Sequence, residues 1–252
     1  MPAFTVGMAS YIAILEGLRF VTGRSVYPRI SRFWIRIFSV AFGVGVVMGV
    51  ITPFQIGSKW SRFADAAGNV LGPLFAYERL TAFFLEPAFL GVLLFGRKLV
   101  PPCVHFMAAL MVASGMLFSS FWILAANSWM QTPASYAIAD GRFFPKDWFG
   151  LASSSSFRFR LADPVTGFYV TTAFVVLAIA AWADPQGTIR RRGTRHVFDD
   201  ALDFLLPLQI FLGDQRNPNL AAHQPAKLAV IEARWDMCAA AGQTTPRNAQ
   251  SQ

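Results

Sequence analysis

Long hydrophobic runs separated by short polar and basic connections form the main pattern of the chain. A helix needs about 20 apolar residues to cross a hydrocarbon layer ~30 Å thick. Five runs approach or exceed this length and a sixth is shorter: residues 4–20, 33–54, 73–96, 103–126, 165–182 and 201–213. The sixth contains Pro207 and Asp203 and follows Asp199 and Asp200. The pattern predicts an all-α fold, a polytopic transmembrane helix bundle of five to six spans.

The last part of the chain differs from the hydrophobic part. Residues 214–252 are polar and rich in Gln, Asn, Pro and Ala, with helix entry expected at Pro225. Proline is tolerated there because the first turn of a helix leaves its N–H groups unpaired. We therefore expect a transmembrane helical domain over residues 1–213 and a separate loop-like segment over residues 214–252.

Composition agrees with a membrane protein. The chain is 54% hydrophobic and only 14% charged, whereas soluble domains carry about 25% charged residues. A net charge of +8 could indicate nucleic acid in a soluble protein, but here the basic residues lie between apolar runs. The two cysteines, Cys103 and Cys238, form no spacing typical of a disulfide framework or a metal site.

The distribution of Lys and Arg predicts how the bundle is oriented. The first, third and fifth connections are the most basic, and they contain Arg24, Arg29, Arg32, Arg97, Lys98, Arg190, Arg191, Arg192 and Arg195. The second and fourth connections carry a smaller basic excess, partly offset by Asp65, Asp140 and Asp147, and their basic residues are Lys59, Arg62, Arg142, Lys146, Arg158 and Arg160. The positive-inside rule then places the N-terminus and the C-terminal tail outside the cytoplasm.

Two carboxylic acids within the third hydrophobic run are the main candidates for chemistry. An acidic residue in a membrane helix costs about 2.5–3.5 kcal/mol to insert, so Glu78 and Glu86 are functional candidates. Eight positions separate them, which leaves them about 80° apart around an α-helix. Two carboxylates facing one interior at two depths suit a proton path or a charged cofactor. The alternative is a buried pair satisfied by its neighbours, for instance through Arg79.

Other residues give weaker signals. The pair Gly45 and Gly49 has the spacing of a close helix-packing face, and no strand precedes it to suggest a nucleotide-binding loop. His105 is interpreted as an interfacial residue at the cytoplasmic end of the fourth run. A haem usually needs an axial His, Met or thiolate, and the methionines in the runs, Met8, Met48, Met111 and Met116, are interpreted as packing residues.

A set of motifs resembles one known family. They are residues 2–8 (PAFTVGM), 16–18 (EGL), 41–45 (AFGVG), 54–57 (FQIG), 60–61 (WS), 77–78 (YE), 82–86 (AFFLE), 121–124 (FWIL), 127–133 (NSWMQTP), 207–215 (PLQIFLGDQ), 223–227 (HQPAK) and 231–232 (IE). In this order they resemble the N-terminal part of subunit I of cytochrome bd-type quinol oxidases, closer to its cyanide-insensitive branch.

The resemblance implies an enzyme of the bacterial inner membrane. Such an enzyme oxidises quinol at the outer face, reduces dioxygen to water, takes protons from the cytoplasm and assembles with oxidase subunit II. The resemblance implies haem b and haem d in this subunit. Glu78 and Glu86 match the acidic residues beside the haem b and haem d pair, with Glu78 near the metal, and Glu86 and Ser119 match the proton-delivery positions. Lys227 and Glu232 match a quinol-binding pair, although without the resemblance they would be interpreted as a solvated helix.

The sequence also departs from the family pattern. The histidine ligand of the low-spin haem falls on Asp163, and Asp163 with Pro164 is typical of a helix N-cap followed by a first-turn proline. The first haem-ligating histidine lies upstream of Pro2, and the methionine ligand, the third acidic haem ligand and the last helices lie beyond residue 252. We therefore expect little or no oxidase activity from this chain alone.

Several interpretations remain open at this stage. The chain could be a fragment of a longer gene, a haem-less degenerate paralogue or interaction subunit of the oxidase complex, or a chain completed by a separate one. A proton-coupled transporter using Glu78 and Glu86 is a further alternative. It is disfavoured because the sequence has no pair of interrupted helices in two related halves.

Overall fold

The computed structural model describes residues 2–154 and 156–183, together with Pro207 and Ile210. The helices are α1 (Pro2–Thr22), α2 (Val26–Lys59), α3 (Ser61–Leu80), the π-helical turn η1 (Thr81–Leu85), α4 (Glu86–Phe95), the 3₁₀ turn η2 (Gly96–Lys98), α5 (Pro102–Gln131), α6 (Trp148–Ala152) and α7 (Phe157–Ala183). Two strands, β1 (Tyr136–Ala139) and β2 (Arg142–Pro145), lie between α5 and α6. The predicted sixth span and the segment 214–252 lie outside the described residues.

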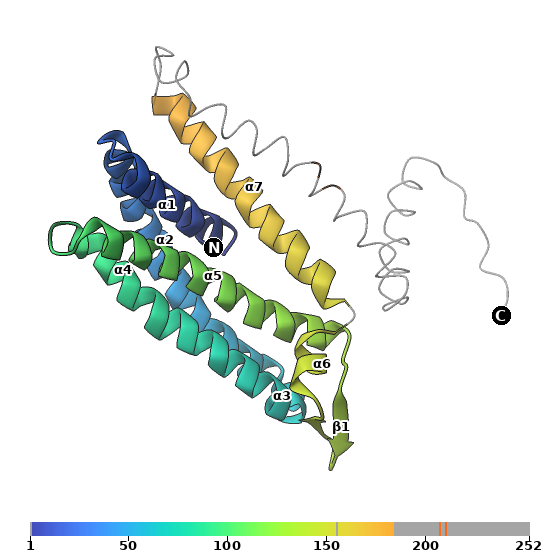
Figure 1. The fold of residues 1–252 in the computed structure, drawn as a ribbon. Coiled ribbons are helices and arrows are strands. Elements are labelled where there is room, and N and C mark those ends of the chain that lie inside the picture. The colour runs from blue at the N-terminus through green and yellow to red at the C-terminus, as the bar shows by residue number, and fades with distance from the viewer. Residues whose placement is uncertain (1, 155, 184–206, 208–209, 211–252) are drawn as a thin grey trace, which may run out of the picture.

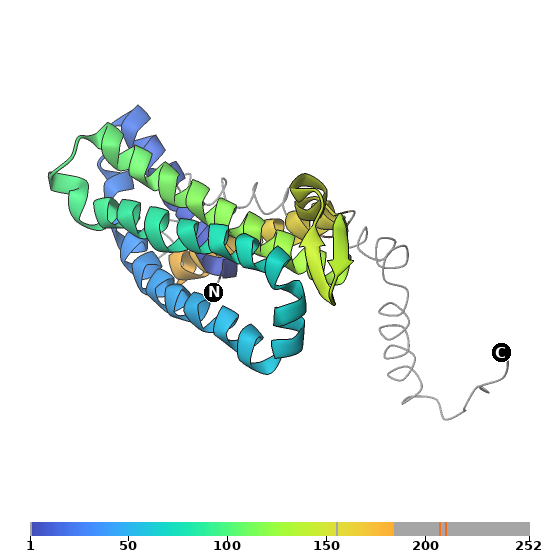
Figure 2. The same ribbon diagram turned by 90° about the horizontal axis from the view of Figure 1, so that it is seen from below.

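The predicted helix bundle is confirmed for the first five runs. Five helical segments are long and apolar enough to cross a membrane, with α3, η1 and α4 counted as one continuous segment. The helix α5 is central, because it contacts α1, α3, α4 and α7. In Figure 1 it lies between α1 and α7 on one side and α3 and α4 on the other. Figure 2 shows α2 running along the bundle to a corner where it meets α3.

The helices extend beyond the hydrophobic runs that predicted them. The run 33–54 lies within α2, which has 34 residues and at 1.5 Å per residue is about 50 Å long. That length exceeds a hydrocarbon core of ~30 Å, so its basic ends can reach the headgroup region. Lys59 and Arg62, which we expected in a connection, lie in α2 and α3, and only Trp60 separates these two helices.

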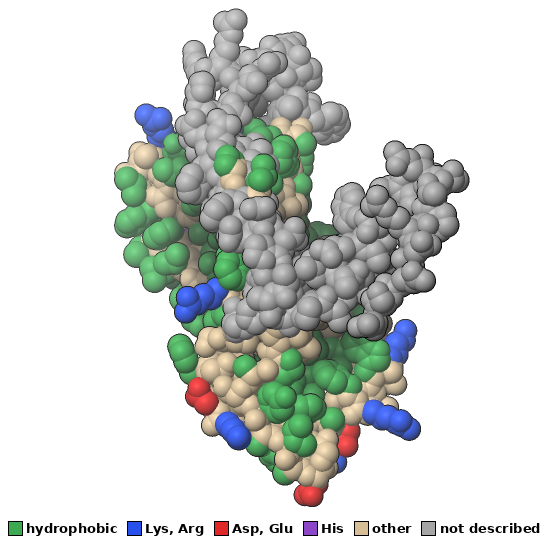
Figure 3. All heavy atoms as spheres, turned by 90° about the vertical axis from the view of Figure 1, so that its right-hand side faces the viewer, with side chains coloured by type: hydrophobic (Ala, Val, Ile, Leu, Met, Phe, Trp, Pro, Cys, Tyr) green, Lys and Arg blue, Asp and Glu red, His purple; other side chains and the backbone are tan. Residues whose placement is uncertain are grey.

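A small hairpin cap, which the sequence did not suggest, closes one end of the bundle. The antiparallel strands β1 and β2 pair from Tyr136 with Pro145 to Ala139 with Arg142. The rings of Tyr136 and Phe143 pack edge-on against Trp129 at the end of α5, with centroids 6.3 and 5.7 Å away. Charged side chains gather around this end, at the bottom of Figure 3, and hydrophobic side chains cover much of the described surface away from it.

The start of α7 differs from the prediction. Asp163 is not an N-cap, because α7 begins at Phe157 and Pro164 lies inside the helix. The earlier start is fixed by backbone hydrogen bonds from Phe157 N to Ser154 O (2.8 Å) and from Arg160 N to Ser156 O (3.1 Å). The hydroxyl of Ser156 also lies 3.0 Å from that of Ser128 on α5. A proline inside a helix removes one backbone hydrogen bond, so Pro164 marks a weak point of α7.

Candidate functional site

A partly open cavity of about 270 Å³ is lined by residues of α1, α2, α3, η1, α4 and α5. Most of its lining is apolar. The polar groups on it are the carboxylic acids of Glu78 and Glu86 and the hydroxyls of Thr5, Thr52, Ser119 and Ser120. An apolar pocket with a few convergent polar groups is the usual form of a ligand or reaction site. The structure therefore brings together three of the predicted site residues, Glu78, Glu86 and Ser119.

Glu86 is the most deeply buried of these groups. Only 2% of its surface is exposed, and its Oε1 atom has no hydrogen-bond partner among the described residues. An unsatisfied buried polar atom is costly and points to strain, to a catalytic role or to a missing partner. Because Glu86 also lines the cavity, the arrangement indicates a group that acts on, or accepts, something inside it.

Glu78 lies on the same side of the helix as Glu86. The hydroxyl of Ser119 on α5 donates a hydrogen bond to Glu78 Oε1 over 3.3 Å. The π-helical turn η1 separates the two acids, and such a turn holds one residue more than an α-turn. Because the π-turn takes up one residue, the eight-residue separation corresponds to seven steps of a regular α-helix. The angle between the two acids around the helix axis therefore falls from about 80° to about 20°. The sequence predicted a shared direction but not the π-turn that improves it.

Two glycines of α2, Gly45 and Gly49, face the cavity and do not pack against another helix of the described residues. Gly45 and Gly49 line the cavity beside Met48, and a Cβ atom added to either glycine would meet no heavy atom of the described residues within 4 Å. Among the residues that the structure describes, the predicted close helix packing at these glycines is therefore not found. Small residues at four-residue spacing only establish a smooth helix face, and here open space lies opposite that face. This space lets α2 border a ligand near Glu78 and Glu86.

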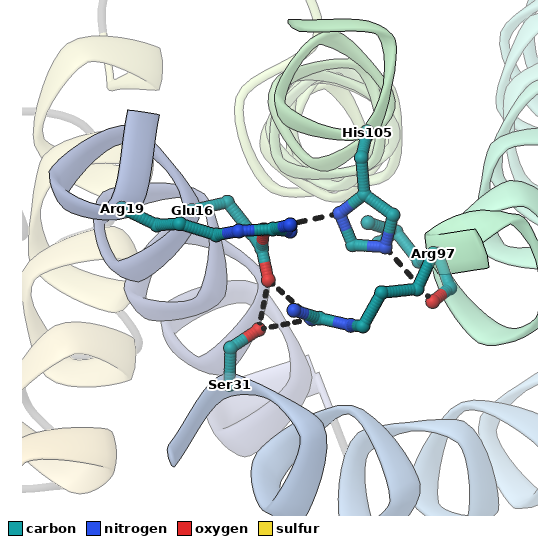
Figure 4. Close-up of polar contacts among 6 residues, drawn as sticks. Glu16, Arg19, Ser31, Arg97 and His105 are labelled. Atoms are coloured by element: carbon teal, nitrogen blue, oxygen red, sulfur yellow. Dashed lines mark hydrogen bonds and ion pairs between the residues drawn. The ribbon is translucent and has the colours of Figure 1, made fainter. Parts of the chain in front are cut away.

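A second polar cluster, which the sequence analysis missed, lies around Glu16. This residue is 1% exposed and accepts hydrogen bonds from Arg97 (2.5 Å), Arg19 (3.2 Å) and Ser31. The ring of His105 completes the cluster, with Nδ1 3.1 Å from Glu16 Oε2. Figure 4 shows these side chains converging from α1, α2, η2 and α5. We call this set, Glu16, Arg19, Ser31, Arg97 and His105, the Glu16 cluster.

The interpretation of His105 as an interfacial residue is wrong. His105 is 1% exposed, and its Nε2 atom lies 3.2 Å from the carbonyl oxygen of Leu93. Both ring nitrogens are therefore occupied by protein groups. The sequence did contain a signal: an acid, Glu16, near the end of the first hydrophobic run, an arginine directly after the third run and a histidine near the start of the fourth. In an antiparallel bundle these three positions lie at the same end.

The donor set of the cavity can be compared with the needs of a haem. The cavity offers the carboxylates of Glu78 and Glu86, the thioethers of Met48 and Met116, and the open glycine face. The unpartnered Glu86 Oε1 and the free space at Gly45 and Gly49 fit a flat group bound against α2. The same does not hold at Asp163, to which the family resemblance assigns a haem-ligating histidine, because a carboxylate is not among the usual axial ligands of a haem iron. His105 offers no substitute, because both of its nitrogens are engaged.

The remaining predicted site residues, Lys227 and Glu232, lie outside the described residues. The structure therefore brings together the acids and the serine of the cavity and leaves the proposed quinol pair as a prediction.

Comparison with known proteins gives consistent matches. A family model described as cytochrome bd terminal oxidase subunit I matches residues 1–249. Cytochrome bd-II ubiquinol oxidase subunit 1 of Escherichia coli (strain K12) is 33% identical over 235 residues, covering 92% of this chain and 46% of that protein. Cytochrome bd ubiquinol oxidase subunit 1 of Bacillus subtilis (strain 168) is 29% identical over 239 residues, covering 92% of this chain and 50% of that protein.

A solved structure supports the same relationship. The bd oxidase from Geobacillus thermodenitrificans superposes with a TM-score of 0.75 and 27% identity, covering 90% of this chain and 54% of the matched one. The chain thus spans about half the length of the relatives that it matches.

Proposed function

The chain belongs to the cytochrome bd terminal oxidase subunit I family, and we propose that it contributes to a membrane complex that passes electrons from quinol to dioxygen. The relatives from Escherichia coli and Bacillus subtilis are named as ubiquinol oxidase subunits, which supports a quinol as the electron donor of those proteins. The observation in this chain that carries the proposal is Glu86, a nearly fully buried acid with an unpartnered oxygen in the same cavity as Glu78 and Ser119.

The cavity suits the proton side of this reaction. Reducing dioxygen to two waters takes four electrons and four protons, and two quinols supply four electrons when they become quinones. The protons consumed must reach a site inside the membrane, where protonatable side chains mark such paths. We assign Glu86 as the group that holds a proton at its Oε atoms inside the cavity. Glu78, oriented by the hydroxyl of Ser119, is the second proton-holding group.

Haem b and haem d are the cofactors that the family implies. A haem bound in the cavity supplies electron storage and a place for dioxygen to react. Glu78 and Glu86 are the residues proposed to face it, and Gly45 and Gly49 leave space for it. A low-spin haem does not fit at Asp163, and no step of the proposal passes through one there.

The other parts of the proposal concern location and partners. We propose a multi-pass protein of the bacterial inner membrane, with the N-terminus and the C-terminal tail outside the cytoplasm, assembled with an oxidase subunit II. The excess of basic residues around Arg24 and Arg97 supports this orientation. Lys227 and Glu232 are proposed to bind quinol, since oxidising a quinol needs a hydrogen-bond donor and a proton acceptor.

The main experiment replaces the buried acid. In membranes where this chain supports quinol-dependent oxygen consumption, Glu86→Gln keeps the side-chain shape but removes the proton-holding group. We expect the rate to fall by about 10²–10⁴-fold, the usual contribution of a positioned acid or base. Asp65→Asn is the control, because Asp65 lies on the surface in α3 with a side chain 68% exposed. An unchanged rate in Glu86→Gln would overturn the role proposed for Glu86.

A second candidate function rests on a specific observation. Asp163 in α7 occupies the position to which the family resemblance assigns a haem-ligating histidine, and this favours a haem-less subunit that associates with an oxidase complex without catalysing the reaction. A reduced-minus-oxidised spectrum of membranes expressing only this chain, together with co-purification from cells that also express subunit II, distinguishes the two. Haem b and haem d bands support the oxidase function, and their absence together with stable association with subunit II supports the haem-less function.

A further inference from the structure

The approach of α5 to the turn that carries Glu86 depends on one glycine. A Cβ atom added to Gly115 would lie 2.8 Å from Leu85 Cδ2 and 3.0 Å from Glu86 Cγ. Both distances are shorter than the ~3.5–4.0 Å at which carbon atoms pack best. The site therefore tolerates no side chain at position 115 without movement of Leu85 or Glu86.

The same face of α5 serves both acids of the cavity. Gly115 and Ser119 are four positions apart and so lie one above the other on the helix. Ser119 donates its hydrogen bond to Glu78, while Gly115 lies against the aliphatic part of Glu86, with Oε1 of that residue 3.7 Å from the added Cβ. One turn of α5 thus supplies a hydroxyl where Glu78 needs a partner and an empty position where Glu86 needs room.

The π-turn and the glycine act on the same side chain. The turn η1 ends at Leu85, directly before Glu86, and sets the direction in which Glu86 points. The absence of a side chain at Gly115 sets how far the Cγ atom of Glu86 can approach α5. With both in place, Glu86 is 2% exposed and still lines the cavity.

We propose that Gly115 is a positioning residue that places the carboxyl group of Glu86 in the cavity by leaving room between α5 and the π-turn. Its consequence for proton delivery rests on the proposed function, but the placement itself does not. The prediction is specific, because a methyl group at position 115 meets two different neighbours. Contact with Leu85 affects packing, and contact with Glu86 Cγ moves the carboxyl group.

The test uses infrared spectra of the purified full-length protein in lipid nanodiscs, where Glu86→Gln identifies the carboxyl band of Glu86. We expect Gly115→Ala to shift this band and to lower the thermal stability. In Leu85→Ala/Gly115→Ala the tighter contact is relieved, so stability returns toward that of Leu85→Ala while the shifted band remains. The double variant also provides a folded sample if Gly115→Ala alone does not fold.

Two matched glycine variants serve as controls. Gly91→Ala adds a methyl group on α4 with no heavy atom of the described part of the chain within 4 Å, and Gly17→Ala adds one 3.0 Å from the Phe106 ring, away from the cavity lining. Both are expected to leave the Glu86 band in place. The proposal would be overturned by any of three results: the Glu86 band does not shift in folded Gly115→Ala, it returns to its original position in the double variant, or it shifts equally in Gly17→Ala. These spectra need neither quinol nor bound haem, so they can fail independently of the oxidase function.

Discussion

The Nδ1 atom of His105 on α5 lies 3.1 Å from the Oε2 atom of Glu16 on α1, and each side chain is 1% exposed. The residues are 89 positions apart. With Arg97 bound to the same carboxylate, this contact ties α1, η2 and α5 together at one end of the bundle. The buried apolar side chains of Leu90, Ala109 and Val112 belong to the main hydrophobic core of the described residues. Because Arg97 lies in the turn between α4 and α5 and His105 lies in α5, the Glu16 cluster also holds the hairpin formed by these two helices. This hairpin carries Glu86 and Ser119.

Removing the charge of Glu16 is expected to destabilise the protein strongly. Glu16→Gln leaves Arg97 and Arg19 without their counter-charge, and breaking a buried ion pair in this way costs about 3–5 kcal/mol. Unfolding in detergent, followed by thermal denaturation, measures the change. Asp65→Asn is the matched control, since Asp65 and Arg142 form an exposed ion pair, for which about 0–1 kcal/mol is typical. Equal losses in the two variants would contradict a structural role for the Glu16 cluster.

Replacing His105 is expected to affect stability and not the cofactor spectrum. Both ring nitrogens are within hydrogen-bond distance of protein atoms, one of Glu16 and the other of the Leu93 carbonyl, so the ring is not available to bind a haem iron. His105→Gln should lower the unfolding temperature and leave any haem bands of the oxidase at the same wavelengths. Loss or displacement of a band, measured per folded protein, would show instead that His105 is a ligand.

Filling the glycine face of α2 is expected to exclude the proposed haem from the cavity without unfolding the helix. Gly45→Leu or Gly49→Leu adds a side chain where no heavy atom of the described residues lies within 4 Å of the Cβ position, and both residues line the cavity. Gly43→Leu is the control, because Gly43 has the same free space but is exposed and does not line the cavity. We expect the haem content per protein, measured by extraction, to fall at positions 45 and 49 and to stay constant at 43. Equal haem content in all three variants would argue against this cavity as the binding site.

These results show which features can be predicted from sequence. The hydrophobic runs predicted the membrane helices because burial in lipid requires about 20 apolar residues whatever surrounds them. The ends of α2 and α3 were misplaced because Lys59 and Arg62 are polar yet remain helical, and hydropathy alone does not distinguish a polar helix end from a loop.

The cavity was only partly predictable for a different reason. Glu78 and Glu86 stood out because acids are rare in membrane helices. By contrast, the contacts of Glu16 join residues 15, 81 and 89 positions away, and no local pattern encodes such distances. The spacing of Gly45 and Gly49 establishes a smooth surface, but only the packing of α2 against the other helices decides whether a helix or a cavity lies opposite.

The proposed orientation can be tested with a cysteine at each end of the bundle. Cys103 is exposed at the start of α5, close in sequence to Arg97 and Lys98, and Ala139 is exposed on the hairpin cap at the other end of that helix. Because the positive-inside rule places the Arg97 end in the cytoplasm, a membrane-impermeant thiol reagent added to intact spheroplasts should not label Cys103 in a Cys238→Ser variant. It should label the single cysteine of Cys103→Ser/Cys238→Ser/Ala139→Cys, and lysis should expose Cys103. The reverse labelling pattern would show that the bundle has the opposite orientation. Protons taken from the cytoplasm would then enter at the hairpin end, which is nearer to Glu78 than to Glu86.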